Sequence, residues 1–236
     1  MNYGHAPRGA IFFFLAVLPF SMMAQNLSVE DAYLQQTAEI QVIRELSADT
    51  SREQKEMALA YISEIIDRGT ANDDICEILA SLTFDGVQNQ VRLGGRLINN
   101  FPDIRIRAID YLAQIGSPEA KKRLIDILNF SLHATNVVED PSVITAAIKG
   151  LTKIGLSDSG DTLRSINAAF QRYNSLRPDN ALALAVVTAI DTFVDKGVMD
   201  DTNANIVILM TIQTNYEYIR SVRDSALNVI TKLRGI

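Results

Sequence analysis

The amino-acid sequence predicts an all-α protein built from stacked antiparallel helix pairs. Apolar residues recur at helical spacing from Ser28 onward, with no sustained two-residue alternation of the kind that indicates strands. Short polar breaks divide this pattern into helices of ordinary length, and the breaks carry helix-capping residues and glycines. A segment that begins at Pro102 also repeats from Pro141, a shift of 39 residues.

The first element in the chain is an N-terminal targeting segment. Arg8 supplies a positive charge, an apolar run covers Ile11 to Phe20, and the small residue Ala24 follows. This order is typical of a secretory signal peptide, so we predict that residues 1–24 are removed, with cleavage near Ala24. An uncleaved anchor is the alternative, although the run is shorter than the roughly 20 residues that span a bilayer. We expect the mature chain to be periplasmic or secreted, with no stable membrane insertion.

The composition limits what the rest of the chain can be. The chain has 236 residues, of which 47% are hydrophobic, and this is enough for one sizeable core or a short array of repeats. Its single cysteine excludes a disulfide scaffold. The 28 acidic residues outnumber the 22 Lys and Arg residues, which argues against a nucleic-acid groove because such a groove needs a basic stripe. We expect residues 25–236 to form a single domain.

Helix boundaries are marked at both ends of the predicted helices. Capping side chains precede a helix at Ser28, at Thr50–Ser51 and, directly before a proline, at Ser117 and Asp140. Glycines follow amphipathic stretches, where a left-handed residue can close the last helical turn. These glycines are Gly69, Gly116, Gly155 and Gly235.

The internal repetition predicts which positions form the core. The shift of 39 residues places Ala108, Ile109, Leu112 and Gly116 on Ala147, Ile148, Leu151 and Gly155. A shift of 79 residues, close to two periods, places Ala147, Ile148, Leu151 and Ile154 on Ala226, Leu227, Ile230 and Leu233. One helix pair cannot bury its apolar stripe alone, so stacked pairs share a continuous core. The predicted repeats are 101–132 and 140–174, with weaker ones over 50–83, 179–214 and 215–236.

The stretch from Phe101 to Ala120 resembles a HEAT-type repeat of the short bacterial kind. It combines a Pro-Asp opening, an arginine two residues after the aspartate, an Ala-x-x-x-Leu core and an Ile-Gly-Ser-Pro-Glu-Ala turn. Over 141–173 the resemblance is weaker, because Ser142 replaces the aspartate. The resemblance implies a right-handed, armadillo-like α-solenoid that holds other macromolecules. It implies no chemistry.

The segment from Thr83 to Asn100 fits the helical pattern poorly. It contains Asp85-Gly86 and Gly94-Gly95, and Val91 to Leu93 alternates as a strand would. We expect a helix with a break here; an irregular linker or a short hairpin is the alternative.

No set of residues in the sequence predicts catalysis. Cys76 lies among apolar residues at helical spacing with no local base or positive neighbour, so we expect a buried, inert thiol. His133 is the one histidine of the expected mature chain, and a zinc site needs more His or Cys ligands than that. We therefore predict no catalytic residue, no metal site and no cofactor, and a protein that is not an enzyme.

A protein-binding surface is the remaining expectation. In the family resembled, the second helices of the repeats line the concave face, so we expect equivalent positions there to form polar ladders, with Lys122 over Asp161 and His133 over Arg172. Phe130 is either an exposed anchor or a core residue. The segment Asn205 to Thr214 is apolar all round, so we expect it to be buried between repeats or covered by another subunit. The candidate partner-binding residues are Lys122, Asp126, Asn129, Phe130, His133 and Arg172.

From these observations we expect a non-enzymatic interaction module or scaffold in the bacterial envelope that binds a partner protein through its curved surface. One alternative is a fixed structural component of an envelope-spanning assembly. Another is an enzyme or an enzyme-accessory subunit, which the shortage of His and Cys in the mature chain disfavours.

Overall fold

The computed structural model describes residues 29–133, 140–157, 160–199 and 201–235, with side chains from residue 36 onward except those of 131–133. The expected signal peptide and its cleavage site near Ala24 lie outside the described residues. None of the helices in the described ranges combines the length and apolar character that crossing a membrane requires.

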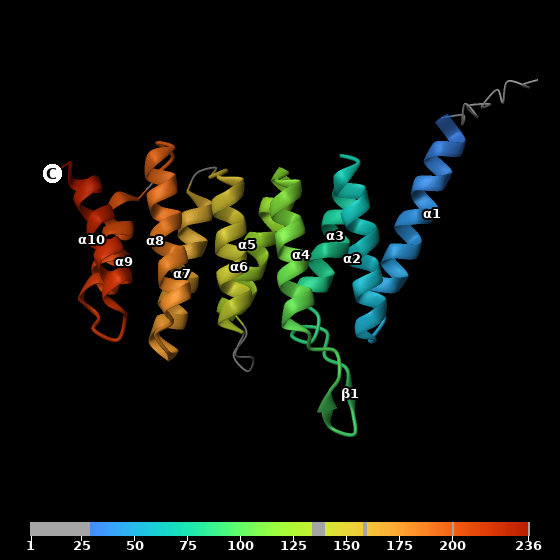
Figure 1. The fold of residues 1–236 in the computed structure, drawn as a ribbon, viewed down its shortest axis with the longest axis horizontal. Helices are drawn as coiled ribbons and strands as arrows, with labels where there is room; N and C mark the ends of the chain where they lie inside the picture. The colour runs from blue at the N-terminus through green and yellow to red at the C-terminus, as the bar shows by residue number, and fades with distance from the viewer. Residues whose placement is uncertain (1–28, 134–139, 158–159, 200, 236) are drawn as a thin grey trace, which may run out of the picture.

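The described part of the chain folds into ten helices and one two-stranded hairpin (Figure 1), so the all-α prediction is confirmed. The hairpin strands are β1 (Arg92–Leu93) and β2 (Arg96–Leu97). The helices are α1 (Val29–Ala48), α2 (Arg52–Asp67), α3 (Asp73–Thr83), α4 (Pro102–Ile115), α5 (Pro118–His133), α6 (Pro141–Ile154), α7 (Asp161–Leu176), α8 (Asn180–Asp195), α9 (Thr202–Thr214) and α10 (Arg220–Arg234).

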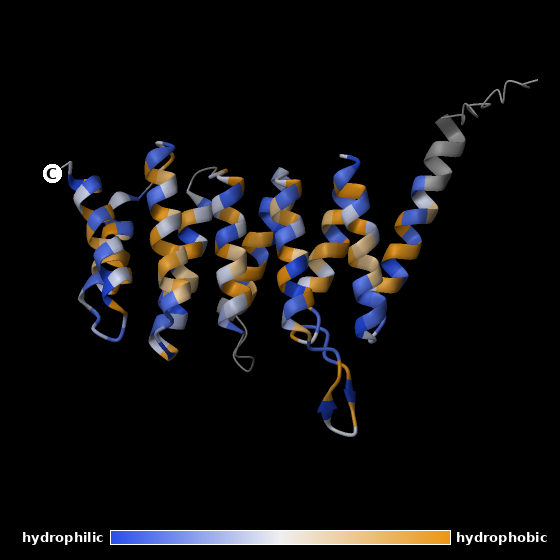
Figure 2. Ribbon diagram, viewed as in Figure 1, coloured by the Kyte–Doolittle hydropathy of each residue, from blue (hydrophilic) through white to orange (hydrophobic). Residues whose placement is uncertain are grey.

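The helices form two layers. The even-numbered helices α2 to α10 lie side by side in one layer, and the odd-numbered helices α1 to α9 lie behind them (Figure 1). Most helices contact the next helix of their own layer and their sequence neighbour in the other layer. The apolar residues between the layers form one continuous core that extends from Ile40 to Ile230 (Figure 2). Each helix therefore buries its apolar stripe against several neighbours.

Helices begin at three of the predicted capping residues. The Ser51 side chain accepts a hydrogen bond from the backbone N–H of Gln54, and Ser117 Oγ accepts one from the N–H of Ala120 at 3.1 Å. Asp140 Oδ1 accepts one from the N–H of Ser142 at 2.9 Å. Each side chain satisfies a backbone donor that the first helical turn leaves without a partner. The cap expected at Ser28 lies outside the described residues.

Helices α4 and α6 match each other closely. Both have 14 residues and begin with proline, and Gly116 and Gly155 close them in the left-handed conformation with φ of 65° and 68°. The helices pack so closely that a Cβ added at Gly150 of α6 would lie 3.1 Å from Leu124 Cδ1 and 3.2 Å from Ala113 Cβ. The predicted helix ends at Gly116 and Gly155 are confirmed, as is the predicted start after Asp140.

The expected helix with a break over Thr83–Asn100 is wrong, and the hairpin alternative is correct. Leu93 pairs with Arg96 in an antiparallel ladder, which leaves Gly94 and Gly95 as a two-residue turn. Their φ angles are 57° and 83°, the left-handed combination that matches the twist of a tight hairpin and that glycine adopts at least cost. Two such residues in succession are incompatible with a continuing helix.

The last helix pair is less covered than the sequence predicts. In α9, Val207 and Met210 are 57% and 43% exposed, so the expectation that this helix is buried between repeats is wrong for this face, and the alternative that another subunit covers it stays a prediction. In α10, Leu227 is 47% exposed, whereas Ile148 at the corresponding predicted position is fully buried. The reason is that α10 has no following helix in the described chain.

Candidate interaction surfaces

The hairpin between α3 and α4 stands on a buried ion pair. Lys55 of α2 extends its ammonium group to Asp85 Oδ2, at 2.9 Å, and the two side chains are 2% and 14% exposed. The same ammonium group donates a hydrogen bond to the backbone carbonyl of Ser47, also at 2.9 Å. A buried charge is tolerated only when it is paired and hydrogen-bonded, and both conditions are met here. The pair ties the start of the hairpin segment to α1 and α2.

Asn99 closes the base of the hairpin from the other side. Its amide nitrogen donates to Asp85 Oδ1 at 2.7 Å and to the carbonyl of Asn89 at 2.6 Å, and its oxygen accepts from the N–H of Val91 at 2.9 Å. Asn99 is 1% exposed. Gly86 has a φ of 71°, and a Cβ there would lie 2.6 Å from Asn100 Cα, so the two ends of the hairpin are in direct backbone contact.

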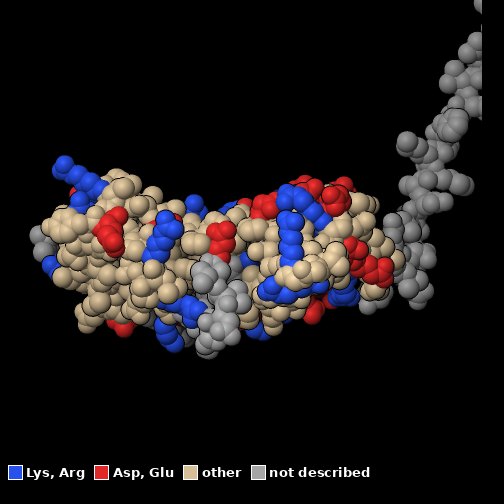
Figure 3. Space-filling model, turned by 90° about the horizontal axis from the view of Figure 1, so that it is seen from below, with Lys and Arg blue, Asp and Glu red and all other residues tan. Residues whose placement is uncertain are grey.

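The tip of the hairpin projects from one edge of the array (Figure 1) and carries exposed apolar and basic side chains. Leu93 is 73% exposed and Val91 is 39% exposed. Arg96 lies opposite Leu93 in the ladder and is exposed. Arg92 precedes Leu93, and its guanidinium group donates to the carbonyl of Gly95 at 3.2 Å and to Gln90 Oε1 at 3.1 Å. Figure 3 looks onto this edge, where Lys and Arg side chains gather beside Asp and Glu. The tip therefore combines a leucine with two guanidinium groups on a fixed base.

The residues predicted for the partner surface lie on α5 and α7, in one layer of the array. Lys122 is exposed, whereas Asp126 is partly buried, and this burial raises the pKa of its carboxyl group. The neighbouring Lys121 pairs with Asp161 at 2.9 Å, and its side chain is 5% exposed. The predicted place of Lys122 over Asp161 stays a prediction. One residue along a helix is a rotation of about 100°, so the buried Lys121 and the exposed Lys122 face different surroundings.

Phe130 packs against another side chain and is not an exposed anchor. Its ring contacts the ring of Phe84 edge to face, with centroids 5.3 Å apart, and Phe84 immediately precedes the hairpin segment. Asn129 and Arg172 are half-buried, and both have interaction partners. The side chain of His133 lies outside the described residues, so its predicted place over Arg172 stays a prediction. Phe130 thus supports the hairpin base from α5.

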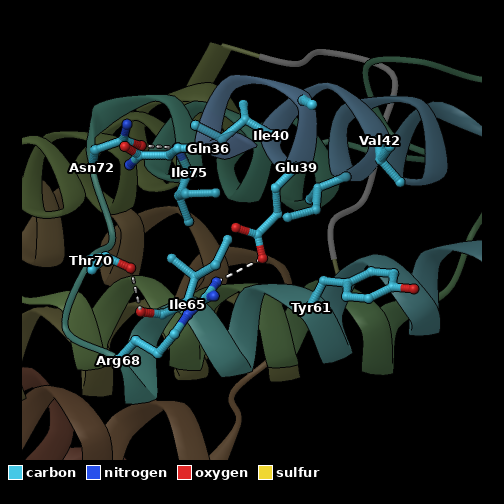
Figure 4. A pocket seen from close by; sticks show the side chains of 12 residues that line it. Gln36, Glu39, Ile40, Val42, Tyr61, Ile65, Arg68, Thr70, Asn72 and Ile75 are labelled. Carbon is cyan, nitrogen blue, oxygen red and sulfur yellow. Dashed lines mark hydrogen bonds and ion pairs between the residues drawn. The ribbon is translucent and has the colours of Figure 1, made fainter. Parts of the chain in front are cut away.

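A groove of about 630 Å³ opens between α1 and α2 at the N-terminal end of the array. Ile40, Ile65 and Ile75 contribute apolar side chains to it, and Tyr61 and Val42 lie at its exposed side (Figure 4). An ion pair crosses it: Arg68 Nη2 lies 2.7 Å from Glu39 Oε1. The remaining lining residues are Gln36, Ala38, Ile43, Thr70 and Asn72.

The described side chains show no arrangement suited to metal or thiol chemistry. Within this part of the chain, no three His, Cys, Asp or Glu side chains group as metal ligands do. Cys76 is fully buried in α3, as the sequence predicts, and burial raises the pKa of its thiol. A raised pKa disfavours the thiolate, which is the reactive form.

Comparisons with known proteins identify no family for this chain. No family model matches the chain, and no curated protein or solved structure matches it either.

Proposed function

We propose that this protein is a non-enzymatic helical-repeat scaffold of the bacterial envelope that binds a partner protein, with the β1–β2 hairpin as its main contact. The hairpin tip is the observation that carries this proposal. A leucine that is 73% exposed is ordinary on a loop, but this one stands on a base built from a buried ion pair and a buried asparagine. Fixing an apolar side chain in water has no benefit for folding.

The tip also indicates the chemistry of the partner. Arg96 lies opposite Leu93, so a matching surface would present a carboxylate beside a small apolar recess. Guanidinium groups bind carboxylates through two parallel hydrogen bonds, which fixes orientation as well as strength. Because the base is already held by hydrogen bonds, binding would cost the hairpin mainly side-chain entropy at its tip, with little backbone entropy.

Two features of the sequence support the scaffold and its location. The resemblance of Phe101–Ala120 to a HEAT-type repeat, together with two-layer helix packing, favours an α-solenoid. The apolar run from Ile11 to Phe20, followed by Ala24, favours export into the envelope.

The test is affinity purification of the tagged full-length chain after cross-linking in its own cell envelope. We expect one protein to co-purify in near-equal amount, and the double variant Leu93→Ser/Arg96→Glu to reduce that recovery about tenfold. The matched control is Leu176→Ser on α7, an exposed leucine far from the hairpin in sequence, which should leave recovery unchanged. Circular dichroism would verify that each variant keeps its helix content.

Equal recovery of the same protein by the hairpin variant and the unmodified chain would refute the hairpin as the main contact. Adding excess untagged chain before cross-linking then separates two kinds of scaffold. An exchangeable partner would be displaced, whereas a fixed component of an assembly would not.

A further inference from the structure

The C-terminal end of the array exposes a core position. Ile109 of α4 lies against α6, because a Cβ at Gly150 would be 3.7 Å from Ile109 Cγ2. Ile109 and its counterpart Ile148 in α6 are fully buried, whereas Leu227, at the corresponding position of α10, is 47% exposed. The position that contacts the next helix of the layer is thus apolar in α10 as well, although the described chain supplies no next helix.

Other side chains on the same end support this reading. Lys232 pairs with Asp191 of α8 at 2.6 Å, so the opposite side of α10, which carries Leu227, faces away from the array. Met210 of α9 lies there too, because Arg234 of α10 contacts its sulfur at 3.9 Å. Met210 is 43% exposed, so it extends the apolar surface from α10 onto α9.

The N-terminal end of the array has an apolar surface of its own. Arg52 pairs with Asp103 of α4, so the opposite side of α2, which carries Met57 and Tyr61, faces away from the array. These two side chains are 46% and 39% exposed, and Tyr61 lines the groove between α1 and α2 (Figure 4). The groove between α1 and α2 therefore faces away from the array at the N-terminal end. Leu227 and Met210 face away from the array at the C-terminal end.

The two ends also differ in charge. From Gln36 to Arg68 the chain has seven acidic and four basic residues, and from Thr202 to Gly235 it has two acidic and four basic residues. Arg220, Arg223 and Arg234 lie on the outward side of α10, across the helix from Lys232. The guanidinium group of Arg223 also lies over the ring of Tyr216, 4.9 Å from its centre. The helices of the α1–α2 end thus carry a net negative charge and those of the α9–α10 end a net positive charge, whereas Glu39 and Arg68 within the groove pair with each other.

We propose that this chain binds a second copy of itself head to tail, with the α9–α10 end of one copy seated against the α1–α2 end of the next. Leu227 and Met210 contact Met57 and Tyr61 across the interface, and the arginines of α10 face the acidic residues of α1 and α2. The contact joins two different surfaces. A bound pair therefore still has one free α1–α2 end and one free α9–α10 end, to which further copies can bind.

The test uses the exported chain, purified from cells that express all 236 residues, with its mass measured by light scattering. At low salt and up to about 100 μM, where a micromolar interface is saturated, we expect the mean mass to exceed that of one chain. Raising the salt from about 50 to about 500 mM should weaken association about tenfold, because salt screens the charge pairing.

Two variants distinguish head-to-tail binding from a symmetric dimer. Tyr61→Ser removes the ring from the N-terminal end and Leu227→Asp places a charge in the C-terminal end, so each variant alone should be monomeric. Mixed in equal amounts, they should form a dimer and stop there, because each brings one intact end. Leu176→Asp, which places the same charge on an exposed leucine of α7, should associate as the unmodified chain does.

Three results would overturn the proposal. The first is an unmodified chain that remains monomeric over the whole concentration range. The second is continued association of either variant alone, which would indicate a symmetric contact between like ends. The third is a mixture that stays monomeric while both variants keep the helix content of the unmodified chain.

Discussion

The contact between α4 and α6 and the base of the hairpin hold their neighbours in opposite ways. Between α4 and α6 the contact is apolar, with Ile109 and Ala113 of α4, and Leu124 of the adjoining α5, packed around Gly150. At the hairpin base, the connection is carried by the buried side chains of Lys55 and Asn99 and the largely buried side chain of Asp85, through bonds of 2.6 to 2.9 Å. Apolar packing is spread over many weak contacts, whereas a buried polar network depends on every member being satisfied.

This difference indicates which part of the molecule is sensitive to single changes. Losing one methylene between α4 and α6 removes a small part of a large contact. Losing one member of the polar network leaves its partners buried without compensation. The hairpin, which we propose to be the binding element, therefore depends on the less forgiving of the two connections.

The largest expected effect comes from Lys55→Ala. The substitution leaves the Asp85 carboxylate buried without its cation, and we expect the free energy of unfolding to fall by about 3 kcal/mol. Urea unfolding followed by circular dichroism measures this. The double variant Lys55→Met/Asp85→Asn removes both charges and keeps an oxygen that accepts from Asn99, so it should recover most of the loss. A single variant as stable as the unmodified chain would contradict the comparison.

Gly150→Val tests the apolar contact and should have a smaller effect. The added methyl groups collide with Leu124 and Ala113, and overpacking of this kind costs about 2 kcal/mol. Gly150→Ala is the matched control: its Cβ fits tightly, but the gain in helix propensity of about 1 kcal/mol offsets the crowding. Thermal unfolding of both variants would decide. If valine were tolerated as well as alanine, α4 and α6 could separate more easily than their packing implies.

Asn99→Ala should have the smallest effect on the whole molecule and a large one on the hairpin. It removes three hydrogen bonds at the base, yet the helices do not depend on them, so we expect a global loss of about 1 kcal/mol. Amide hydrogen exchange over residues 90–98 should accelerate far more than exchange in α4. Uniform acceleration across both would show that the hairpin and the helix array unfold as one unit.

The helix boundaries were predictable because their causes are local. Asp140 caps α6 by accepting a hydrogen bond from the backbone N–H of Ser142, two residues later. Gly155 ends the same helix because it adopts a left-handed φ angle. The hairpin was only the alternative prediction although Gly94 and Gly95 signalled its turn, since its base depends on Lys55, which lies far away in the sequence. No local pattern shows that a lysine on one helix will pair with an aspartate beyond the next.

The candidate surface was less predictable for the same reason. Lys121 and Lys122 are adjacent and chemically identical, and only the rotation of α5 against α7 decides which one reaches Asp161. Sequence spacing gives that rotation to within about one residue, and one residue moves a side chain from a buried position to an exposed one. Phe130 was left open between anchor and core because its partner, Phe84, belongs to the segment whose fold was mispredicted.

The burial of the Cys76 thiol limits how fast it can be oxidised or alkylated. As the only cysteine in the chain, it can form a disulfide only with another molecule, and full burial together with a raised pKa keeps it from doing so while α3 stays packed. An alkylating reagent would reach the sulfur only in moments when the surrounding helices separate. Its labelling rate thus measures how often the helices around α3 open by local unfolding.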